Sequence, residues 1–393
     1  MPPANRVLLR AINRSQVLNT IRTHGPISRA DIARVTGLSQ ATITTITAEL
    51  INEGLILEKQ TGNSTGGRPP ILLDLNPESL YVVGLKLTEH YISAALTNIR
   101  ADVITNLTIP ASGETHSVEW VVDFVEEAVE RSLTAAGVGR GQLAGVGIGM
   151  AGVIDSVTGE CRYSPFFQWQ DVPFRQLVEE RLRVPVYVDN DVNTLTMAEQ
   201  WFGHGRDVDD FLVITIGRGI GMGIVVNGQF YRGAGGGAGE LGHTVIDPEG
   251  PLCDCGKHGC LETYVSDGAL VRQARDALQG EELIIEEMVA RASDGEPALQ
   301  AIFERAGHVL GVGVANMVNI FDPARIIITG EGTRAGALLF DPMLESIERH
   351  TFNGLAEDVE IVIQEWGDEA WARGAASLVL RELYKSPIHK VSR

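Results

Sequence analysis

Three cysteines within eight residues constrain this chain more tightly than any other feature of its sequence. They stand in the run Cys-Asp-Cys-Gly-Lys-His-Gly-Cys at positions 253–260, and the fourth cysteine lies far away at position 161. In a cytosolic protein such a dense cluster indicates a metal site rather than a set of disulfides. The two glycines inside the run allow the backbone to fold around a single ion.

Zinc is the metal that this loop predicts, because it prefers four nitrogen or sulfur ligands in a tetrahedron. We expect the ligands Cys253, Cys255, Cys260 and His243. His258 is the weaker candidate, since it lies inside the loop, where ligation would strain the backbone. A closed four-ligand site is structural and leaves no position for a catalytic water. The alternative is a set of free, buried cysteines.

The length of 393 residues predicts two or three domains. With 44% hydrophobic and 21% charged residues, the composition is that of a globular chain. No apolar run reaches the roughly 18 residues that span a bilayer. The first ten residues lack the apolar core and small-residue cleavage site of a secretion signal. We therefore expect a cytoplasmic protein with no membrane partner.

The charge is distributed unevenly along the chain. The net charge is −19, but the first 75 residues hold eight Lys/Arg against five Asp/Glu and so carry +3, which leaves −22 for the rest. A mildly basic head on an acidic body is typical of a DNA-binding domain joined to a soluble module. Chance asymmetry is the alternative.

The first 75 residues follow the pattern of a winged helix-turn-helix. Hydrophobic spacing predicts helices over 13–24, 29–36 and 40–53, with Ser28 and Ser39 as N-caps and Gly37 in the turn. Short strands at 55–59 and 71–75 flank a Gly- and Pro-rich wing at 61–70. Helix, helix, turn, helix and a two-stranded wing form a DNA-reading module.

From residue 81 the chain alternates strands and helices, which indicates an α/β body. Strands are expected at 81–87, 91–97, 103–109, 143–149, 184–188, 211–216, 223–226 and 326–329, and helices at 118–136, 191–202, 263–278, 282–293, 296–320 and 369–384. Hairpins begin near 81 and again near 211, so we expect two related lobes with a cleft between them. The expected domains are 1–75, 76–200 and 201–393, with the last helix packing back on the first lobe.

Two further motifs suit a ligand cleft. Gly217-Arg-Gly-Ile-Gly-Met-Gly223 allows backbone amides to approach a phosphate, or forms a tight hairpin alone. Asp189-Asn-Asp-Val-Asn193 follows a buried strand, where a carboxylate faces the cleft of an α/β protein and can accept a hydroxyl proton. Its structural alternative is an N-cap for the next helix. The run at 147–152 fits the dinucleotide template but lacks the helix that must follow.

Together these motifs resemble the ROK family (repressors, open reading frames, kinases). The resemblance rests on Glu240-x-Gly-His243, the cysteine run that ends at Glu262, Asn190-Asp191-x-Asn193, and the winged helix with Gly-Gly-Arg-Pro-Pro in its wing. It covers nearly the whole chain. The winged helix places the chain with the regulators, because the kinase members lack that domain.

The resemblance implies a two-lobed, actin-like ATPase fold of the sugar-kinase type, with a sugar in the cleft. The residues that would hydrogen-bond sugar hydroxyls are Asn190, Asp191, Glu240, His243 and Glu262. His243 would use one ring nitrogen for the sugar and the other for zinc, so that the metal orients the ring.

The chain departs from the kinase pattern at both phosphate loops. Family kinases open with Asp-x-Gly-Gly-Thr, whereas the matching stretch here is Gly84–Glu89, with Lys86 in place of the acid. Arg218 stands between glycines where kinases carry a small hydroxyl residue. These changes argue against ATP-Mg binding and therefore against an enzyme. Asp191, the equivalent of the kinase base, is retained, and we interpret it as a sugar ligand.

The DNA-reading residues should lie at the start of the third helix, which enters the major groove. Gln40 can pair with adenine edges and the Thr42 methyl can contact thymine. The other expected contacts are Ser39, Thr44 and Thr45 in the helix and Arg68 in the wing.

We therefore expect a sugar-responsive repressor that binds double-stranded operator DNA as a homodimer or homotetramer. An active or bifunctional sugar kinase is the first alternative, and the changed first hairpin argues against it. A regulator controlled by a protein partner is the second, and the intact sugar constellation argues against it.

Overall fold

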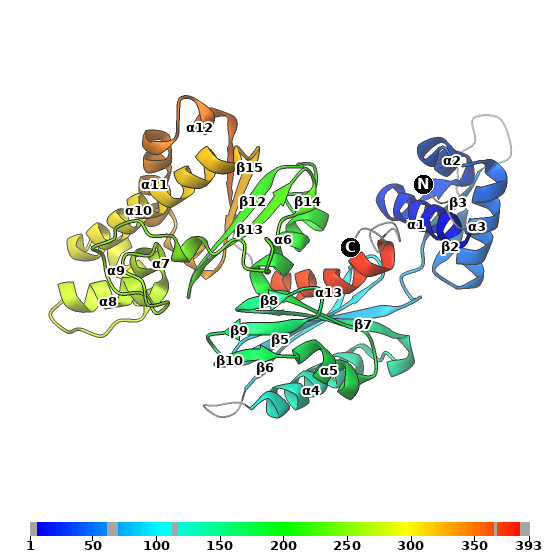
Figure 1. Ribbon diagram of the computed structural model, residues 1–393, viewed down its shortest axis with the longest axis horizontal. Helices are drawn as coiled ribbons and strands as arrows, with labels where there is room; N and C mark the ends of the chain where they lie inside the picture. The colour runs from blue at the N-terminus through cyan, green and yellow to red at the C-terminus, as the bar shows by residue number, and fades with distance from the viewer. Residues whose placement is uncertain (1–5, 61–69, 112–116, 365–367, 386–393) are drawn as a thin grey trace.

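The computed structural model describes residues 6–60, 70–111, 117–364 and 368–385 of the chain. A small N-terminal head is followed by two α/β lobes, with the C-terminal helix beside the head (Figure 1). The expected fold class, a winged helix-turn-helix joined to a two-lobed α/β body, is confirmed. The boundaries proposed after residues 75 and 200 stay a prediction.

The head packs three helices against a three-stranded sheet of order β1-β3-β2. Its elements are α1 (Arg6–His24), β1 (Ile27–Ser28), α2 (Arg29–Thr36), α3 (Gln40–Asn52), β2 (Ile56–Gln60) and β3 (Ile71–Leu75). The Ser28 and Ser39 hydroxyls accept backbone N–H bonds as N-caps, and Gly37 ends α2 at a φ of 71°. The three expected local signals are therefore present.

Helix α1 begins seven residues earlier than expected, at Arg6 rather than at residue 13. Its first turns are held by ion pairs to α3, between Arg10 and Glu49 and between Arg14 and Glu53. Hydrophobic periodicity does not detect such contacts, because they join charged side chains that are far apart in the sequence.

The first lobe is built on a five-stranded sheet of order β11-β7-β4-β5-β6. Its strands are β4 (Tyr81–Leu87), β5 (Tyr91–Asn98), β6 (Val103–Pro110), β7 (Leu143–Met150) and β11 (Val186–Asn190). Strand β4 pairs antiparallel with β5 and parallel with β7. Helices α4 (Val118–Ala136) and α5 (Phe174–Leu182) pack on this sheet, and α5 was not expected.

A small antiparallel sheet at 153–172 is a further element that the sequence pattern did not predict. It consists of β8 (Val153–Asp155), β9 (Glu160–Ser164) and β10 (Trp169–Val172). Its strands are short and carry exposed polar residues, so they lack a hydrophobic period. The Trp169 ring anchors them on the lobe by packing 5.1 Å from the ring of Phe174.

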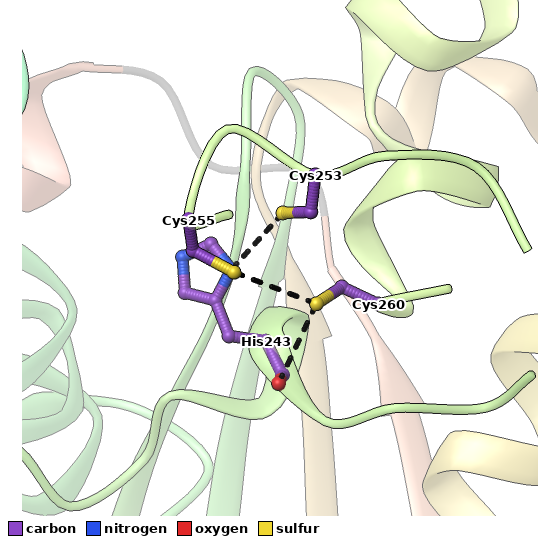
Figure 2. Close-up of side chains that lie close together, drawn as sticks. All are labelled: His243, Cys253, Cys255 and Cys260. Carbon is purple, nitrogen blue, oxygen red and sulfur yellow. Dashed lines mark hydrogen bonds between the residues drawn. The ribbon is translucent and has the colours of Figure 1, made fainter. Parts of the chain in front are cut away.

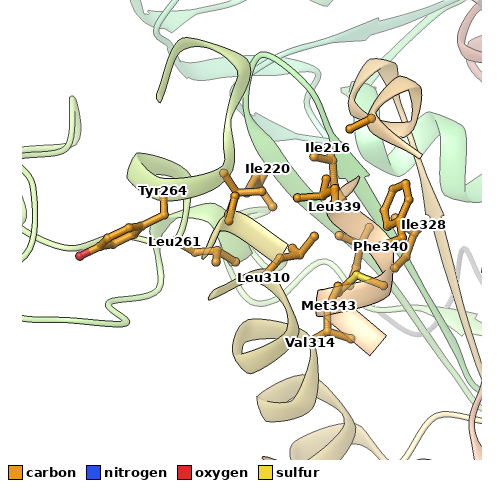
Figure 3. Close-up of a cluster of buried hydrophobic side chains, with 14 of the residues drawn as sticks. Ile216, Ile220, Leu261, Tyr264, Leu310, Val314, Ile328, Leu339, Phe340 and Met343 are labelled. Carbon is orange, nitrogen blue, oxygen red and sulfur yellow. The ribbon is translucent and has the colours of Figure 1, made fainter. Parts of the chain in front are cut away.

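The second lobe repeats the hairpin-then-parallel arrangement in a sheet of order β14-β13-β12-β15-β16. Its strands are β12 (Phe211–Ile216), β13 (Ile220–Val226), β14 (Gln229–Phe230), β15 (Arg325–Thr329) and β16 (Glu360–Ile363). Its helices are α7 (Glu262–Val265), α8 (Asp267–Ala277), α9 (Ile285–Ser293), α10 (Pro297–Phe321), α11 (Ala337–His350) and α12 (Leu355–Asp358). Leu310 and Val314 of α10 meet Phe340 and Met343 of α11 in its core (Figure 3).

The single helix expected over 263–278 is two helices, because Ser266 breaks it. Ser266 is extended, at a ψ of 154°, and its hydroxyl caps α8 by accepting the N–H of Ala269. Serine is favoured as an N-cap and disfavoured inside a helix, so a new helix, α8, starts after Ser266.

Helices α6 (Asp191–Phe202) and α13 (Asp368–Tyr384) lie side by side between the two lobes (Figure 1). The backbone of helix α13 packs directly against the backbone of the first-lobe sheet. A Cβ at Gly84 would lie 1.9 Å from the Ala372 carbonyl oxygen, and a Cβ at Gly147 would lie 1.8 Å from the Ala375 carbonyl oxygen. Only glycine permits this approach, so α13 is seated firmly against the strands.

Candidate functional site

The four expected metal ligands lie together in the second lobe (Figure 2). His243 ends the short helix η2 (Leu241–His243), and the cysteine loop folds back over it. The Sγ of Cys253 lies 3.6 Å from His243 Nδ1, and the Sγ atoms of Cys255 and Cys260 are 3.6 Å apart. All four ligand atoms lie within 4.8 Å of one another. The cluster can therefore hold a metal ion.

These spacings fit a tetrahedral ion. A Zn–S distance of about 2.3 Å gives S–S edges of about 3.8 Å. The loop also requires its glycine at 259, where a Cβ would lie 1.5 Å from the Asp247 carbonyl oxygen. Burial raises the pKa of the Cys260 thiol to about 12, and binding to a divalent cation would favour the thiolate instead. His258 bonds the Gly250 carbonyl and stays outside the cluster.

Asn190 and Asp191 lie where strand β11 ends and helix α6 begins. Asn190 is the N-cap: its Oδ1 accepts from the N–H groups of Val192 and Asn193, and its Nδ2 donates to the Gly152 carbonyl at 3.0 Å. The capping role that the sequence left open is therefore present. The Asn190 amide could also bind a sugar while it caps the helix, and this role stays a prediction.

Glu240 and Glu262 belong to the second lobe and stand before and after the cysteine loop. The Oε2 of Glu262 accepts the N–H of Ile220 at 3.0 Å, at the start of β13 and directly after the glycine-rich turn. A Cβ at Gly219 would lie 2.8 Å from this oxygen, so the turn closes directly on the carboxylate. Glu262 thus connects two segments: it follows Cys260 of the cysteine loop by two residues, and it is hydrogen-bonded to the residue after the glycine turn.

The carboxylates of the two lobes lie close enough to interact electrostatically. Burial raises the pKa of Glu240, the neighbouring charges of Glu262 and Asp191 raise it further, and His243 opposes them. Burial also raises the pKa of Asp191, and the Lys86 ammonium only partly offsets this. The structure thus brings four of the five expected sugar residues into mutual range, and Asn190 adjoins Asp191. Whether they bind a sugar stays a prediction.

Lys86 stands where the kinase resemblance implies the first phosphate loop, and its side chain is almost completely buried. Its Nζ lies 3.5 Å from the Glu331 carboxylate of the second lobe and 4.4 Å from the ring centroid of Trp371. In the second phosphate loop, Arg218 forms a two-pronged ion pair with Glu89 of the β4–β5 turn. At both phosphate positions, a cation on one lobe therefore pairs with a carboxylate on the other.

A third pair between the lobes was not found by sequence reasoning. Arg232, just after β14, donates from Nε and Nη2 to Asp189 Oδ2 at 2.9 and 2.7 Å. Asp189 is fully buried, and its other oxygen accepts from Asn193 Nδ2 at 3.0 Å. Arg232 lies 43 residues from Asp189 in the sequence, so no local pattern indicates the pair. The acid at the end of a buried strand could have prompted a search for a basic partner.

The expected DNA-reading residues lie at the N-terminal end of α3. Gln40, Thr44 and Thr45 are exposed there, and Ser39 caps the helix. The Thr44 and Thr45 hydroxyls donate to the backbone carbonyls of Gln40 and Ala41 within the helix. Arg68 and the rest of the expected wing loop lie outside the described residues. Within the described ranges, no helix is long and apolar enough to cross a membrane.

Two protein families match this chain. Residues 82–382 match the ROK family, and residues 10–56 match a winged helix-turn-helix DNA-binding family. The xylose repressor of Caldicellulosiruptor bescii is 33% identical over 399 residues, covering 98% of this chain and 99% of that protein.

Two crystal structures of known proteins match different shares of this chain. A ROK family transcriptional regulator, a homologue of the Escherichia coli MLC protein, superposes with a TM-score of 0.85 at 30% identity and covers 97% of this chain and 98% of its own. A ROK family glucokinase from Streptomyces griseus, in complex with glucose and AMPPNP, gives a TM-score of 0.66 at 29% identity and covers 98% of its own chain but 76% of this one. The regulator thus matches nearly the whole chain, and the kinase leaves about a quarter unmatched.

Proposed function

From the premise that this chain belongs to the ROK family, we propose that it is a repressor that leaves its operator when a sugar binds in the cleft between its lobes. D-xylose is the first sugar to test, because relatives that match this chain nearly from end to end are named xylose repressors, and N-acetyl-D-glucosamine is the second, because others are named N-acetylglucosamine repressors.

The chain is a DNA-binding transcriptional regulator and not a sugar kinase. It carries the winged helix head in addition to the kinase-like body. At the two phosphate positions it carries Lys86 and Arg218, each already paired with a carboxylate of the opposite lobe. A phosphate group would have to displace these pairs, and the acid that holds Mg²⁺ in a kinase is absent.

The single observation that carries the proposal is that Asp191, Glu262 and His243 all lie near enough to Glu240 to act on the pKa of its carboxyl, in a chain that also carries a DNA-binding head. Carboxylates accept hydrogen bonds from sugar hydroxyls, and Glu240 and Glu262 stand before and after the cysteine loop in the sequence. A sugar bound by residues of both lobes would favour one relative position of the lobes over another. A ligand can shift a conformational equilibrium only through such a difference in affinity.

Zinc is the metal that we assign to the His243 cluster. Zinc bound at Nδ1 would fix the tautomer and the direction of the imidazole, leaving Nε2 for a sugar hydroxyl. The ion would thus be structural and would also orient a sugar ligand. Bound in a closed site, it supplies no catalytic water.

A homodimer is the assembly that we propose on DNA. The head carries little net positive charge, so each head would neutralise few phosphates. Two heads that bind together gain affinity through their effective concentration. A two-fold dimer would require a palindromic operator.

A sugar screen on the full-length chain tests the proposal. Thermal unfolding is measured with D-xylose, D-glucose, N-acetyl-D-glucosamine and D-glucose 6-phosphate, since a ligand at 100 times its Kd stabilises by about 2.7 kcal/mol. The sugar that binds should release the chain from a duplex selected out of random-sequence DNA. The matched control is Asp191→Ala, which should keep DNA binding and lose both sugar effects. Release without sugar specificity, or no response to any of the four, would contradict the proposal.

A further inference from the structure

Helix α6 extends from the candidate sugar site to the DNA-binding head. Its first turn carries Asp191, and its last turn carries Trp201 and Phe202. Twelve residues at a rise of about 1.5 Å make a rod about 18 Å long. One rigid helix thus begins at the candidate sugar site and ends at the DNA-binding head, the two regions that a sugar-responsive regulator must connect.

Close backbone packing ties α6 to its neighbours along its length. A Cβ at Gly374 of α13 would lie 2.3 Å from the Thr194 carbonyl oxygen, and a Cβ at Gly223 of β13 would lie 1.8 Å from Thr196 Oγ1. Helix α6 therefore touches α13 on one side and the second-lobe sheet on the other. Densely packed elements transmit small displacements because they cannot absorb them.

The head docks on the far ends of these two helices. Ser15 Oγ and Asn19 Nδ2 of α1 donate to the Tyr384 carbonyl at the end of α13, at 2.8 and 2.6 Å. The guanidinium of Arg22, also on α1, lies 4.7 Å from the ring centroid of Trp201 and 5.3 Å from that of Tyr384. The hydrophobic core of the head continues into the body at this point.

A second contact to the head comes from the first lobe, next to Ile99, whose carbonyl accepts the Tyr384 hydroxyl at 2.8 Å. Arg100 of the first lobe pairs with Asp74 of β3 at 2.8 Å and donates to the Leu75 carbonyl. This contact belongs to the segment that links the head to β4. The head is therefore held both through the linking segment and through the ends of α6 and α13.

We propose that Arg22 is the positioning residue that carries the state of the sugar cleft to the DNA-binding head, through its seat on Trp201 and Tyr384. The inference rests on the proposed function and names its internal route. A sugar that draws Asp191 toward the second lobe displaces α6 along with it. Trp201 then moves beneath Arg22, and α1 carries this displacement into the head. A planar guanidinium on two aromatic faces responds to such a shift because stacking depends on its orientation.

The competing interpretation is that Arg22 only fastens the head to the body. Loss of Arg22 would then lower stability or operator affinity, but the sugar would still weaken DNA binding by the same factor. The quantity that separates the two interpretations is a ratio: the operator Kd with saturating sugar divided by the Kd without it. Linkage makes this ratio a measure of coupling alone.

The experiment compares Arg22→Met with Arg14→Met in the full-length chain. Arg14 lies on the same helix but pairs with Glu53 inside the head, so its variant is a matched control. Operator Kd is measured by fluorescence anisotropy on the selected duplex, with and without D-xylose, and the Kd for D-xylose by calorimetry. We expect the Kd of Arg22→Met for D-xylose to lie within about twofold of the wild-type value. Its ratio of operator Kd values, with and without D-xylose, should fall to one-fifth of the wild-type ratio or less. Arg14→Met should keep the ratio.

An unchanged ratio in folded Arg22→Met overturns the inference. Should that variant fold poorly, Trp201→Leu removes the same contact from the other side and should lose the ratio in the same way. A wild-type chain that binds D-xylose but shows a ratio of one contradicts the proposed function instead, so the two failures are distinguishable.

Discussion

Cys255 is the exposed member of the metal cluster, whereas Cys253 and Cys260 are buried. Replacing Cys255 by serine should lower the zinc content from one ion per chain to near zero and abolish the sugar response, because His243 would lose the ion that orients it. Metal analysis and calorimetry measure both effects. Cys161→Ser, in the first-lobe core, is the control and should keep its zinc. Wild-type protein purified without chelators yet free of zinc would contradict the assignment.

Glu262 connects the metal loop with the glycine turn through its bond to the Ile220 N–H. Glu262→Gln can keep one oxygen at that bond while it removes the charge. If the carboxylate also accepts a sugar hydroxyl, sugar binding should weaken by about 1.5–3 kcal/mol, the usual value for a charge-assisted hydrogen bond. Operator affinity without sugar should not change.

Calorimetric titration of the folded variant measures this loss. Glu249→Gln, an exposed change in the same loop region, serves as the control. Wild-type affinity in Glu262→Gln would remove this residue from the sugar site and leave it only its role in holding the turn.

At the scale of elements, the β4–β5 and β12–β13 hairpins decide whether the body can act on ATP. Both carry a cation that pairs across the cleft, Lys86 with Glu331 and Arg218 with Glu89. We expect no sugar phosphorylation above background in a coupled ADP-release assay, with the Streptomyces griseus glucokinase as the positive control. Sugar-dependent ADP release that Asp191→Asn abolishes would contradict this and support a kinase.

The seat of α13 on strand β4 is an element contact that a single methyl group would disturb. A Cβ at Gly84 would lie 1.9 Å from the Ala372 carbonyl oxygen, so Gly84→Ala forces the helix away from the sheet. Overpacking of this kind costs about 1–3 kcal/mol of unfolding free energy. Gly141→Ala, where no atom lies within 4 Å, should be neutral. Equal urea midpoints for the two variants would refute the predicted clash.

On the scale of the whole molecule, a single substitution in the head should weaken DNA binding without changing sugar binding. Removing the whole head should not separate the two activities in this way. The core of the head includes Ala376, Val379 and Leu380 of α13, so removal of the head would expose apolar surface on the body. Gln40→Ala in the full-length chain should weaken operator binding by about 1–3 kcal/mol, the value of one bidentate base contact.

The sugar affinity of Gln40→Ala should equal that of the wild type, because Gln40 lies in the head. Gln176→Ala, an exposed change on the first lobe, is the matched control and should alter neither affinity. Parallel losses of operator and sugar binding in Gln40→Ala would contradict this separation of tasks.

Elements with strong local signals were predicted almost to the residue. Helices α2, α4 and α6 have the expected bounds because a capping residue opens each of them and an apolar face follows. Helices α5 and α11 were not predicted, and neither was the sheet at 153–172. Helix α11 carries Pro342 inside it, which reads as a helix breaker. Packing against α10 holds it nonetheless.

The sequence by itself determined the chemistry that is local: the thiol loop, the caps of the head and the polar run at the end of β11. Such features depend on neighbours within about ten residues, and their spacing is visible in the chain. Only the tertiary structure decided which distant groups meet. Lys86 and Glu331 are 245 residues apart, and Ser15 and Tyr384 are 369 apart. These contacts depend on how the packed lobes and helices place their ends, which no local pattern of residues encodes.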